Sequence, residues 1–121
     1  VVACGRRILP KASTVEEARA CLELLSGRRH RVHGGVCVLA PNGRVAERVT
    51  TTMVQVKRLT EIETEAYIHG GEWQGKAGGY AIQGLASAFV PSISGSYSNV
   101  VGLPLAETVG LLQGLGWSRT S

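Results

Sequence analysis

The sequence predicts an α/β protein in which one mixed sheet is flanked by helices. Three observations favour this class. Two stretches with apolar residues at helical spacing each open with a capping box. Two stretches rich in valine and threonine meet at an Asn-Gly turn. No internal sequence repeat, linker or low-complexity tract divides the 121 residues. Because 44% of the residues are hydrophobic, the chain can bury a core, and we expect residues 1–121 to form a single domain.

The first part of the chain combines a short hairpin with a helix. Apolar residues at 1–4 and 8–9 flank a Gly-Arg-Arg tripeptide, which indicates a hairpin or a strand continued after a bulge. Thr14 and Glu17 then form a capping box, and the helix that they open ends at Gly27. Its inner face is predicted to hold the apolar residues that recur at helical spacing: Val15, Ala18, Cys21, Leu22 and Leu25.

Two long strands are predicted in the middle of the chain. Residues 30–39 and 45–57 are rich in valine and threonine, and the Pro-Asn-Gly-Arg segment between them, residues 41–44, is typical of a hairpin turn. We therefore expect these two strands to pair in antiparallel fashion.

A second helix is predicted from the capping box that Thr60 and Glu63 form. The Gly-Gly pair at 70–71 ends it, and Trp73 is expected to pack close by. Three residues are expected to mark its inner side: Ile62, Ala66 and Tyr67.

One more strand and one more helix are predicted in the last third. Residues 85–93 indicate a buried strand with an Ala-Phe-Val centre, which ends near Pro91. Pro104 fits the first turn of a helix that reaches Leu112. The tail, residues 117–121, is expected to fray.

Composition limits the possible function classes. The formal net charge of +4 suits an anionic ligand, and all nine acidic residues are glutamates, so a mechanism that needs an aspartate is incomplete within this chain. Three cysteines without CxxC spacing, Cys4, Cys21 and Cys37, predict reduced and mostly buried thiols. No apolar run is long enough to span a bilayer and no charged-then-apolar leader opens the chain, so we expect a cytoplasmic protein without a membrane partner.

Residues 76–84, Lys-Ala-Gly-Gly-Tyr-Ala-Ile-Gln-Gly, are the most informative stretch for function. Gly78 and Gly79 can adopt positive φ and bring backbone N–H groups close to an anion. Lys76 adds a positive charge, and the Gln83 amide can read the edge of a base. The combination suits a phosphorylated ligand, whereas a plain turn between two elements is the alternative that composition alone favours.

Three other stretches accompany this segment: 25–30, Leu-Ser-Gly-Arg-Arg-His; 47–52, Glu-Arg-Val-Thr-Thr-Thr; and 96–105, Ser-Tyr-Ser-Asn-Val-Val-Gly-Leu-Pro-Leu. In this order the sequence resembles the Maf family, also called septum formation inhibitor proteins, which are nucleoside triphosphate pyrophosphatases. The resemblance runs from the first residue nearly to the last, and KAGGYAIQG and NVVGLPL are its most specific motifs. It implies an elongated mixed sheet of the inosine triphosphatase-like (Maf) fold.

The resemblance also implies roles for individual residues. The family has a catalytic Asp-Thr pair immediately before the Val-Val that opens this chain, so we expect the N-terminal part, with the general base, to be missing and this fragment to be inactive alone. Lys11 is similar to a phosphate-contacting lysine, although it stands in Pro-Lys-Ala where the family usually has Gly-Lys-Pro. Gln83 resembles the branch that acts on dTTP and UTP, whereas a glutamate there goes with methylated guanine nucleotides. For Lys76, phosphate binding and a structural ion pair both remain open.

The function that the resemblance implies is hydrolysis of dTTP, UTP and related non-canonical pyrimidine nucleotides to the monophosphate and pyrophosphate. Mg²⁺, or another divalent cation such as Mn²⁺, is the expected cofactor, and a homodimer is the expected assembly. Two alternatives remain: a non-catalytic nucleotide-binding regulator of cell division, and a structural dimerisation half that binds nothing.

Other kinds of site find less support in the sequence. His30 and His33 are three residues apart in a predicted strand and point to opposite faces, so they cannot chelate one zinc ion together with Cys37. The cysteines lie among apolar residues, which favours core packing over nucleophilic catalysis. The basic run at 28–31 is expected to be a solvated or dimer-facing edge and not a nucleic-acid site, because the chain has only six aromatic residues and no nucleic-acid module. Asn99 is expected to stabilise a turn through hydrogen bonds from its side chain to the backbone.

Overall fold

The computed structural model describes residues 1–116, and the expectation of a frayed tail at 117–121 lies outside them. One sheet is formed in the order β2-β1-β3-β4-β5, and its neighbouring strands are antiparallel. The predicted α/β class, with helices flanking a sheet, is confirmed, but the described strands form an antiparallel sheet and not the mixed sheet that was expected. The strands are β1 (Val2–Cys4), β2 (Arg7–Leu9), β3 (Arg29–Leu39), β4 (Val45–Gln55) and β5 (Ser92–Ser94).

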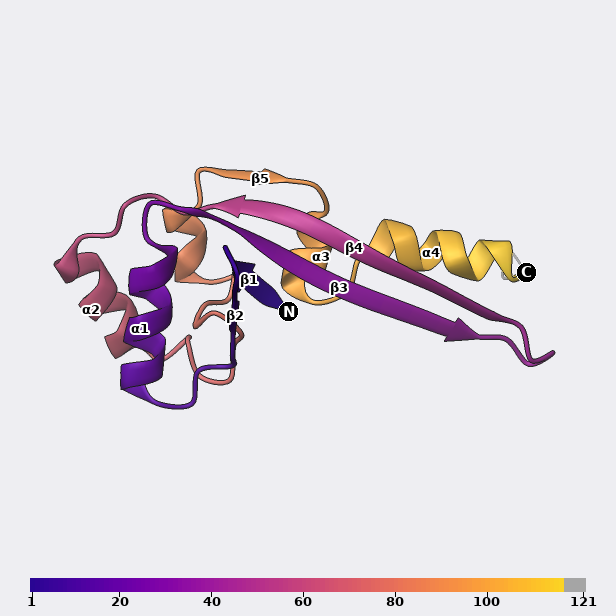
Figure 1. Ribbon diagram of the computed structural model, residues 1–121, viewed down its shortest axis with the longest axis horizontal. Helices are drawn as coiled ribbons and strands as arrows, with labels where there is room; N and C mark the ends of the chain where they lie inside the picture. Colours follow the sequence, from indigo (N-terminus) through magenta and orange to yellow (C-terminus); the bar gives the residue numbers. More distant parts are fainter. Residues whose placement is uncertain (117–121) are drawn as a thin grey trace.

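The helices lie at one end of the sheet, beside its middle, and along the long hairpin at its other end (Figure 1). Helices α1 and α2 pack together at one end, α3 contacts β3 and β4, and α4 lies along the distal part of the β3–β4 hairpin. Within residues 1–116, no helix is long and apolar enough to cross a membrane. The helical elements are α1 (Val15–Leu25), α2 (Glu61–Gly70), the 3₁₀ turn η1 (Leu85–Phe89), α3 (Tyr97–Val101) and α4 (Leu105–Gly114).

The β3–β4 hairpin confirms the predicted antiparallel pair and extends beyond the rest of the sheet (Figure 1). At its tip the Gly43 N–H donates to the Ala40 carbonyl at 2.9 Å, and the Arg44 N–H donates to the Asn42 side chain at 3.0 Å. Gly43 has a φ of +85°, a left-handed conformation that favours glycine. The Asn-Gly pair therefore makes the turn with the asparagine side chain and the glycine backbone.

Helix α1 begins as predicted at Thr14, whose hydroxyl accepts from the Glu17 N–H at 3.1 Å. The Glu17 carboxylate accepts from the hydroxyls of Ser13 and Thr14, so it does not complete the capping box by reaching a backbone N–H. Val15 is 37% exposed, so the predicted inner face is wrong at this position. The other four predicted inner residues of the helix are buried.

Helix α2 has the complete predicted capping box, because Thr60 and Glu63 each accept a backbone N–H from the other, at 3.1 and 3.0 Å. The predicted inner side is wrong at Ile62, which is 83% exposed, and at Ala66, which is also exposed. Trp73 packs near the helix as expected and is 5% exposed. The face that packs inward follows the i, i+3, i+4 spacing of Thr64, Tyr67 and Ile68.

The buried strand predicted over 85–93 is wrong, because most of this segment is the 3₁₀ turn η1. The Ser87 N–H and hydroxyl both donate to the Gly84 carbonyl, at 3.1 and 3.0 Å. The Leu85 N–H donates to the Glu72 carboxylate at 2.8 Å. These bonds supply partners for the backbone, so the segment needs no sheet partner until β5 begins.

The last two helices follow a short turn. Helix α3 was not predicted, and its cap is the Ser96 hydroxyl, which accepts from the Asn99 N–H at 3.2 Å. Helix α4 follows Pro104 as predicted and continues past Leu112 to Gly114.

The hydrophobic core joins α1 and α2 to the sheet and to the loop after α2. Trp73, Tyr80 and Ile82 of that loop are core members, so the predicted ligand-binding segment is anchored at the edge of the core.

Candidate functional site

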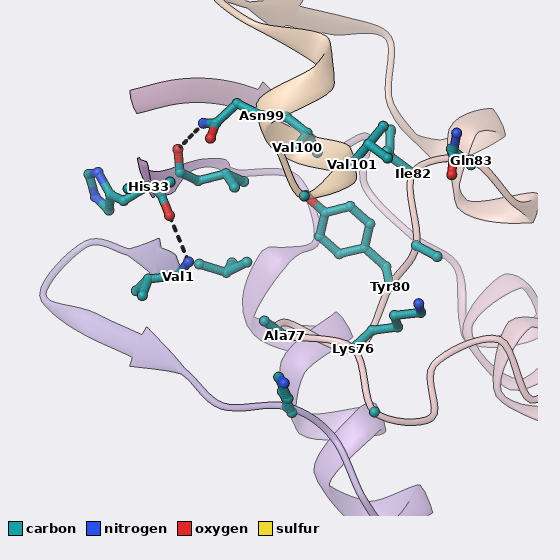
Figure 2. Close-up of a pocket in the computed structure, with 18 residues that line it drawn as sticks. Val1, His33, Lys76, Ala77, Tyr80, Ile82, Gln83, Asn99, Val100 and Val101 are labelled. Atoms are coloured by element: carbon teal, nitrogen blue, oxygen red, sulfur yellow. Dashed lines mark hydrogen bonds between the residues drawn. The ribbon is translucent and has the colours of Figure 1, made fainter. Parts of the chain in front are cut away.

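A cleft of about 600 Å³ opens between the β1 and β3 strands and the loop that follows α2. Figure 2 shows Tyr80 in the middle of the cleft, with Lys76 on one side and Val100 and Val101 of α3 on the other. The predicted residues Lys11, Lys76 and Gln83 all line it. Its other lining residues are Val1, Val2, Val32, His33, Gly34, Gly35, Gly75, Ala77, Tyr80, Ala81, Ile82, Asn99, Val100, Val101 and Gly102.

Backbone pairing brings Lys11 and Lys76 onto neighbouring segments. The Ala12 N–H donates to the Lys76 carbonyl at 3.0 Å, and the Gly75 N–H donates to the Ala12 carbonyl at 2.8 Å. Lys11 itself pairs with Ala77 in an isolated antiparallel bridge. Both lysines are exposed, and within residues 1–116 neither forms an ion pair. Their charges are therefore free to attract an anion into the cleft.

Gly78 and Gly79 support the cleft from behind and do not line it. Their φ angles are +74° and +76°, as predicted. However, the Gly78 N–H donates to the Pro10 carbonyl at 3.1 Å and the Gly79 N–H donates to the Lys76 carbonyl at 3.0 Å. These N–H groups are not free to bind an anion, which corrects the expected role of the two glycines. A Cβ on Gly78 would lie 3.1 Å from Val2 Cγ1, a tight contact that adds to the strain of a side chain at this positive φ.

Gln83 lies exposed at the rim of the cleft (Figure 2). The Gly84 N–H donates to the Ala81 carbonyl at 3.1 Å, which closes a turn with Ile82 and Gln83 at its centre. Ile82 is 4% exposed and anchors the turn in the core. Within residues 1–116, no hydrogen bond occupies the Gln83 side chain, so its amide donor and acceptor are both available to a ligand.

A buried pair of aromatic rings underlies the cleft. His30 Nε2 lies 2.6 Å from the Tyr80 hydroxyl, and the two rings meet edge to face with centroids 5.4 Å apart. His30 is 1% exposed, and burial lowers its pKa to about 4, so the ring is neutral at pH 7. Burial also raises the pKa of Tyr80. The pair is therefore an uncharged, hydrogen-bonded support for the cleft.

Asn99 fastens α3 to the sheet and so builds the opposite wall. Its Nδ2 donates to the carbonyls of Val32 and Thr50, at 3.0 and 3.2 Å, and lies 3.1 Å from the Thr52 hydroxyl. Its Oδ1 rests against Gly34, where a Cβ would overlap that oxygen. Asn99 therefore joins a helix to two strands, a wider role than the turn that was expected from the sequence.

The histidines lie on opposite faces of β3, as predicted. His33 lines the cleft, with Nδ1 2.9 Å from the Thr51 hydroxyl, whereas His30 is in the core. In the described part of the chain no three His, Cys, Asp or Glu side chains could hold a metal ion, and no carboxylate lines the cleft. Magnesium sites in proteins are built from carboxylate and other oxygen ligands. The residues present therefore do not fit a protein-made Mg²⁺ site.

The cysteines and the basic run lie outside the cleft. Cys4 and Cys21 are free and buried, and burial raises the pKa of Cys21, which favours the unreactive thiol. Cys37 is exposed on β3, 4.0 Å from the Glu47 carboxylate, so the expected apolar surroundings are wrong for this residue. The basic run at 28–31 is exposed except for His30.

The wall opposite the lysines was not predicted from the sequence. That wall contains Gly34 and Gly35 of β3 together with Val100, Val101 and Gly102. Two adjacent glycines inside a valine-rich strand are a usable signal, because glycine in a strand often marks the close approach of another group.

Comparison with known proteins shows the family of the chain. Residues 1–115 match the family model described as Maf-like protein. The chain is 64% identical to a protein named dTTP/UTP pyrophosphatase from Paramagnetospirillum magneticum, over 98% of the chain and 62% of that relative. Relatives of the same name from Granulibacter bethesdensis and Mesorhizobium japonicum are 63% and 59% identical over 97% of the chain. The chain spans 55% and 56% of the length of these two relatives.

Proposed function

The chain belongs to the Maf family, and from this premise we propose that it forms the base- and phosphate-binding part of a nucleoside triphosphate pyrophosphatase. The proposed substrates are dTTP, UTP and related non-canonical pyrimidine nucleotides, and the products are the monophosphate and pyrophosphate. The substrate class comes from relatives at 58–64% identity that carry the name dTTP/UTP pyrophosphatase.

One observation supports the proposal most strongly. Lys11 is distant in sequence from the segment that holds Lys76 and Gln83, and a single cleft of about 600 Å³ collects all three. Such a volume lies within the usual range of small-molecule sites, about 300–1,000 Å³. Burial of Gln83 in the core would have ruled the proposal out, but this side chain is exposed at the rim.

In the proposed complex the phosphates lie near the two lysines and the base lies toward Gln83. The positive charge of Lys11 and Lys76 stabilises the negative charge that develops as the bond between the α- and β-phosphates breaks. The imide edge of uracil or thymine offers one N–H donor between two carbonyl oxygens. The Gln83 amide oxygen accepts from that N–H while its amide nitrogen donates to one of the carbonyls.

The general base is proposed to lie outside these 121 residues, since the sequence contains no aspartate and no carboxylate lines the cleft within residues 1–116. We therefore propose little or no catalysis by this chain alone. A divalent cation, Mg²⁺ or Mn²⁺, is proposed to accompany the triphosphate. Because the described residues do not form a site for it, we assign it no catalytic step.

A homodimer and a cytoplasmic location remain predictions. The function is tested by titrating dTTP, UTP and GTP with Mg²⁺ against the complete protein, by which we mean the chain at the full length of its relatives, while pyrophosphate is followed. Turnover with a preference for pyrimidines supports the proposal. Tight binding without turnover supports a nucleotide-binding regulator of cell division, and the lack of both leaves a structural role. Loss of turnover on adding EDTA supports the divalent cation.

A further inference from the structure

We infer that Tyr67 and Glu72, which do not line the cleft, are positioning residues that hold Gln83 in place for selection of the base. The inference rests on the proposed function and deepens it. It identifies what fixes the backbone that carries the selecting amide.

The need for such support follows from the place of Gln83. Its side chain is exposed, and no hydrogen bond within residues 1–116 restrains it, so its position depends on the backbone of the turn at 81–84. A displacement of about 1 Å at a reacting or recognising group can cost about a hundredfold in rate. Base selection by a single amide therefore requires that this turn be held at both ends.

Tyr67 holds the beginning of the turn. The Ala81 N–H donates to the Tyr67 hydroxyl at 3.2 Å. Tyr67 lies on α2, is 2% exposed, and packs edge to face against Phe89 with ring centroids 5.9 Å apart. Because the ring is locked by packing, its hydroxyl is a fixed acceptor for the turn.

Glu72 holds the end of the turn. The Leu85 N–H donates to the Glu72 carboxylate at 2.8 Å. Gly84 lies directly against the same carboxylate, where a Cβ would overlap Oε2. The turn is thus held two residues before Gln83 and two residues after it, by side chains from α2 and the segment that follows α2.

The segment that carries Glu72 also positions one of the cleft lysines. The Trp73 indole N–H donates to the Ile68 carbonyl at 2.8 Å, and the Lys76 N–H donates to the Trp73 carbonyl at 3.1 Å. The same short stretch therefore fixes the backbone of Lys76 and, through Glu72, the backbone of the turn that carries Gln83. Such a fixed separation suits a ligand whose phosphates and base are a set distance apart.

The test measures kcat/KM for UTP and for GTP in the complete protein. Glu72→Ala removes the carboxylate and Tyr67→Phe removes only the hydroxyl, and each is expected to lower the UTP-to-GTP ratio by about tenfold or more. Glu72→Gln keeps an oxygen that can accept from Leu85 and is expected to restore most of the ratio. Glu61→Ala, at an exposed glutamate of α2, and Tyr97→Phe, at an exposed tyrosine of α3, are matched controls that should leave the ratio unchanged.

A double variant that combines Glu72→Ala with Gln83→Ala distinguishes a role that acts through Gln83 from a purely structural role. If Glu72 acts through Gln83, the ratio in the double variant equals that of Gln83→Ala alone, whereas a further fall of the same size overturns the inference. Unchanged ratios in both Tyr67→Phe and Glu72→Ala also overturn it. If Glu72→Ala does not fold, Tyr67→Phe alone and combined with Gln83→Ala carries the test.

The inference and the proposed function fail in different ways. A wild-type protein that turns over UTP and GTP equally overturns both. A wild-type preference for UTP that survives Tyr67→Phe and Glu72→Ala overturns only the role of these two residues.

Discussion

The side-chain oxygen of Asn99 rests on the backbone of Gly34, at a point on β3 where a Cβ would overlap it. The nitrogen of the same amide donates to the carbonyls of Val32 and Thr50, which fixes the orientation of the side chain. Asn99 is 3% exposed and lies on α3. This contact sets how closely α3 approaches the sheet and, with it, the width of the cleft.

Gly34→Ala is expected to lower the free energy of unfolding by about 1–3 kcal/mol, because the added methyl group displaces Asn99 from a packed position. Gly35→Ala is a matched control on the next residue, where an added Cβ meets nothing within 4 Å. Urea unfolding of both variants measures the difference. Equal stability of the two would show that the Asn99 contact does not constrain the strand.

Lys11→Ala and Lys76→Ala are each expected to lower kcat/KM for UTP by about tenfold or more in the complete protein, because each removes a cleft charge that is proposed to face the phosphates. Lys57→Ala is the matched control, since this lysine pairs with Glu63 at 2.6 Å and does not line the cleft. The measurement is kcat/KM for UTP from steady-state kinetics at low and high salt. A Lys57→Ala loss as large as the other two would point to a general effect of charge.

Gln83→Glu is expected to weaken UTP turnover by about tenfold, because a carboxylate cannot donate to a base carbonyl and is repelled by it. Gln74→Glu introduces the same charge at an exposed position outside the cleft and should have little effect. The measurement is kcat/KM for UTP in both variants. An unchanged UTP rate in Gln83→Glu would remove Gln83 from base recognition.

The protein is expected to lose stability on acidification below pH 6.5 because of His30. Burial lowers the pKa of His30 from 6.5 to about 4, so between these values the unfolded chain binds a proton that the folded chain does not. The free energy of unfolding therefore decreases as the pH is lowered, and at pH 5 it is about 2 kcal/mol smaller than at pH 7.

Urea unfolding between pH 7 and pH 5 measures this dependence. His30→Gln is expected to flatten the profile, whereas His33→Gln, at the histidine on the cleft wall, is expected to keep it. The same slope in wild type and His30→Gln would assign the effect to other groups.

Most local elements could be predicted because neighbouring residues encode them. Thr14 and Thr60 cap their helices through residues three positions away, and the Asn-Gly pair makes its own turn. The 3₁₀ turn at 85–89 could not be predicted in this way. It depends on a hydrogen bond to Glu72, 13 residues away, which overrides the strand preference of the apolar residues.

The difference between local contacts and contacts distant in sequence also decides which site residues could be predicted. Lys76 and Gln83 stand in one local motif, so their residue types alone indicated a ligand-binding role, and the cleft contains both. The role of Asn99 depends on the carbonyl of Val32, 67 residues away in sequence, which only the fold brings near. Gly78 and Gly79 had the predicted backbone conformation, but contacts with Pro10 and Lys76 occupy their N–H groups.

Whether this cleft binds a pyrimidine triphosphate is measured by chemical-shift mapping of the ¹⁵N-labelled complete protein during a titration with UTP. If the cleft binds UTP, the largest amide shifts fall on Lys11, Lys76 and Gln83 and their neighbours, with none of comparable size at the hairpin tip, residues 40–44. Shifts of equal size across the whole chain, or shifts confined to the hairpin tip, would contradict binding in the cleft.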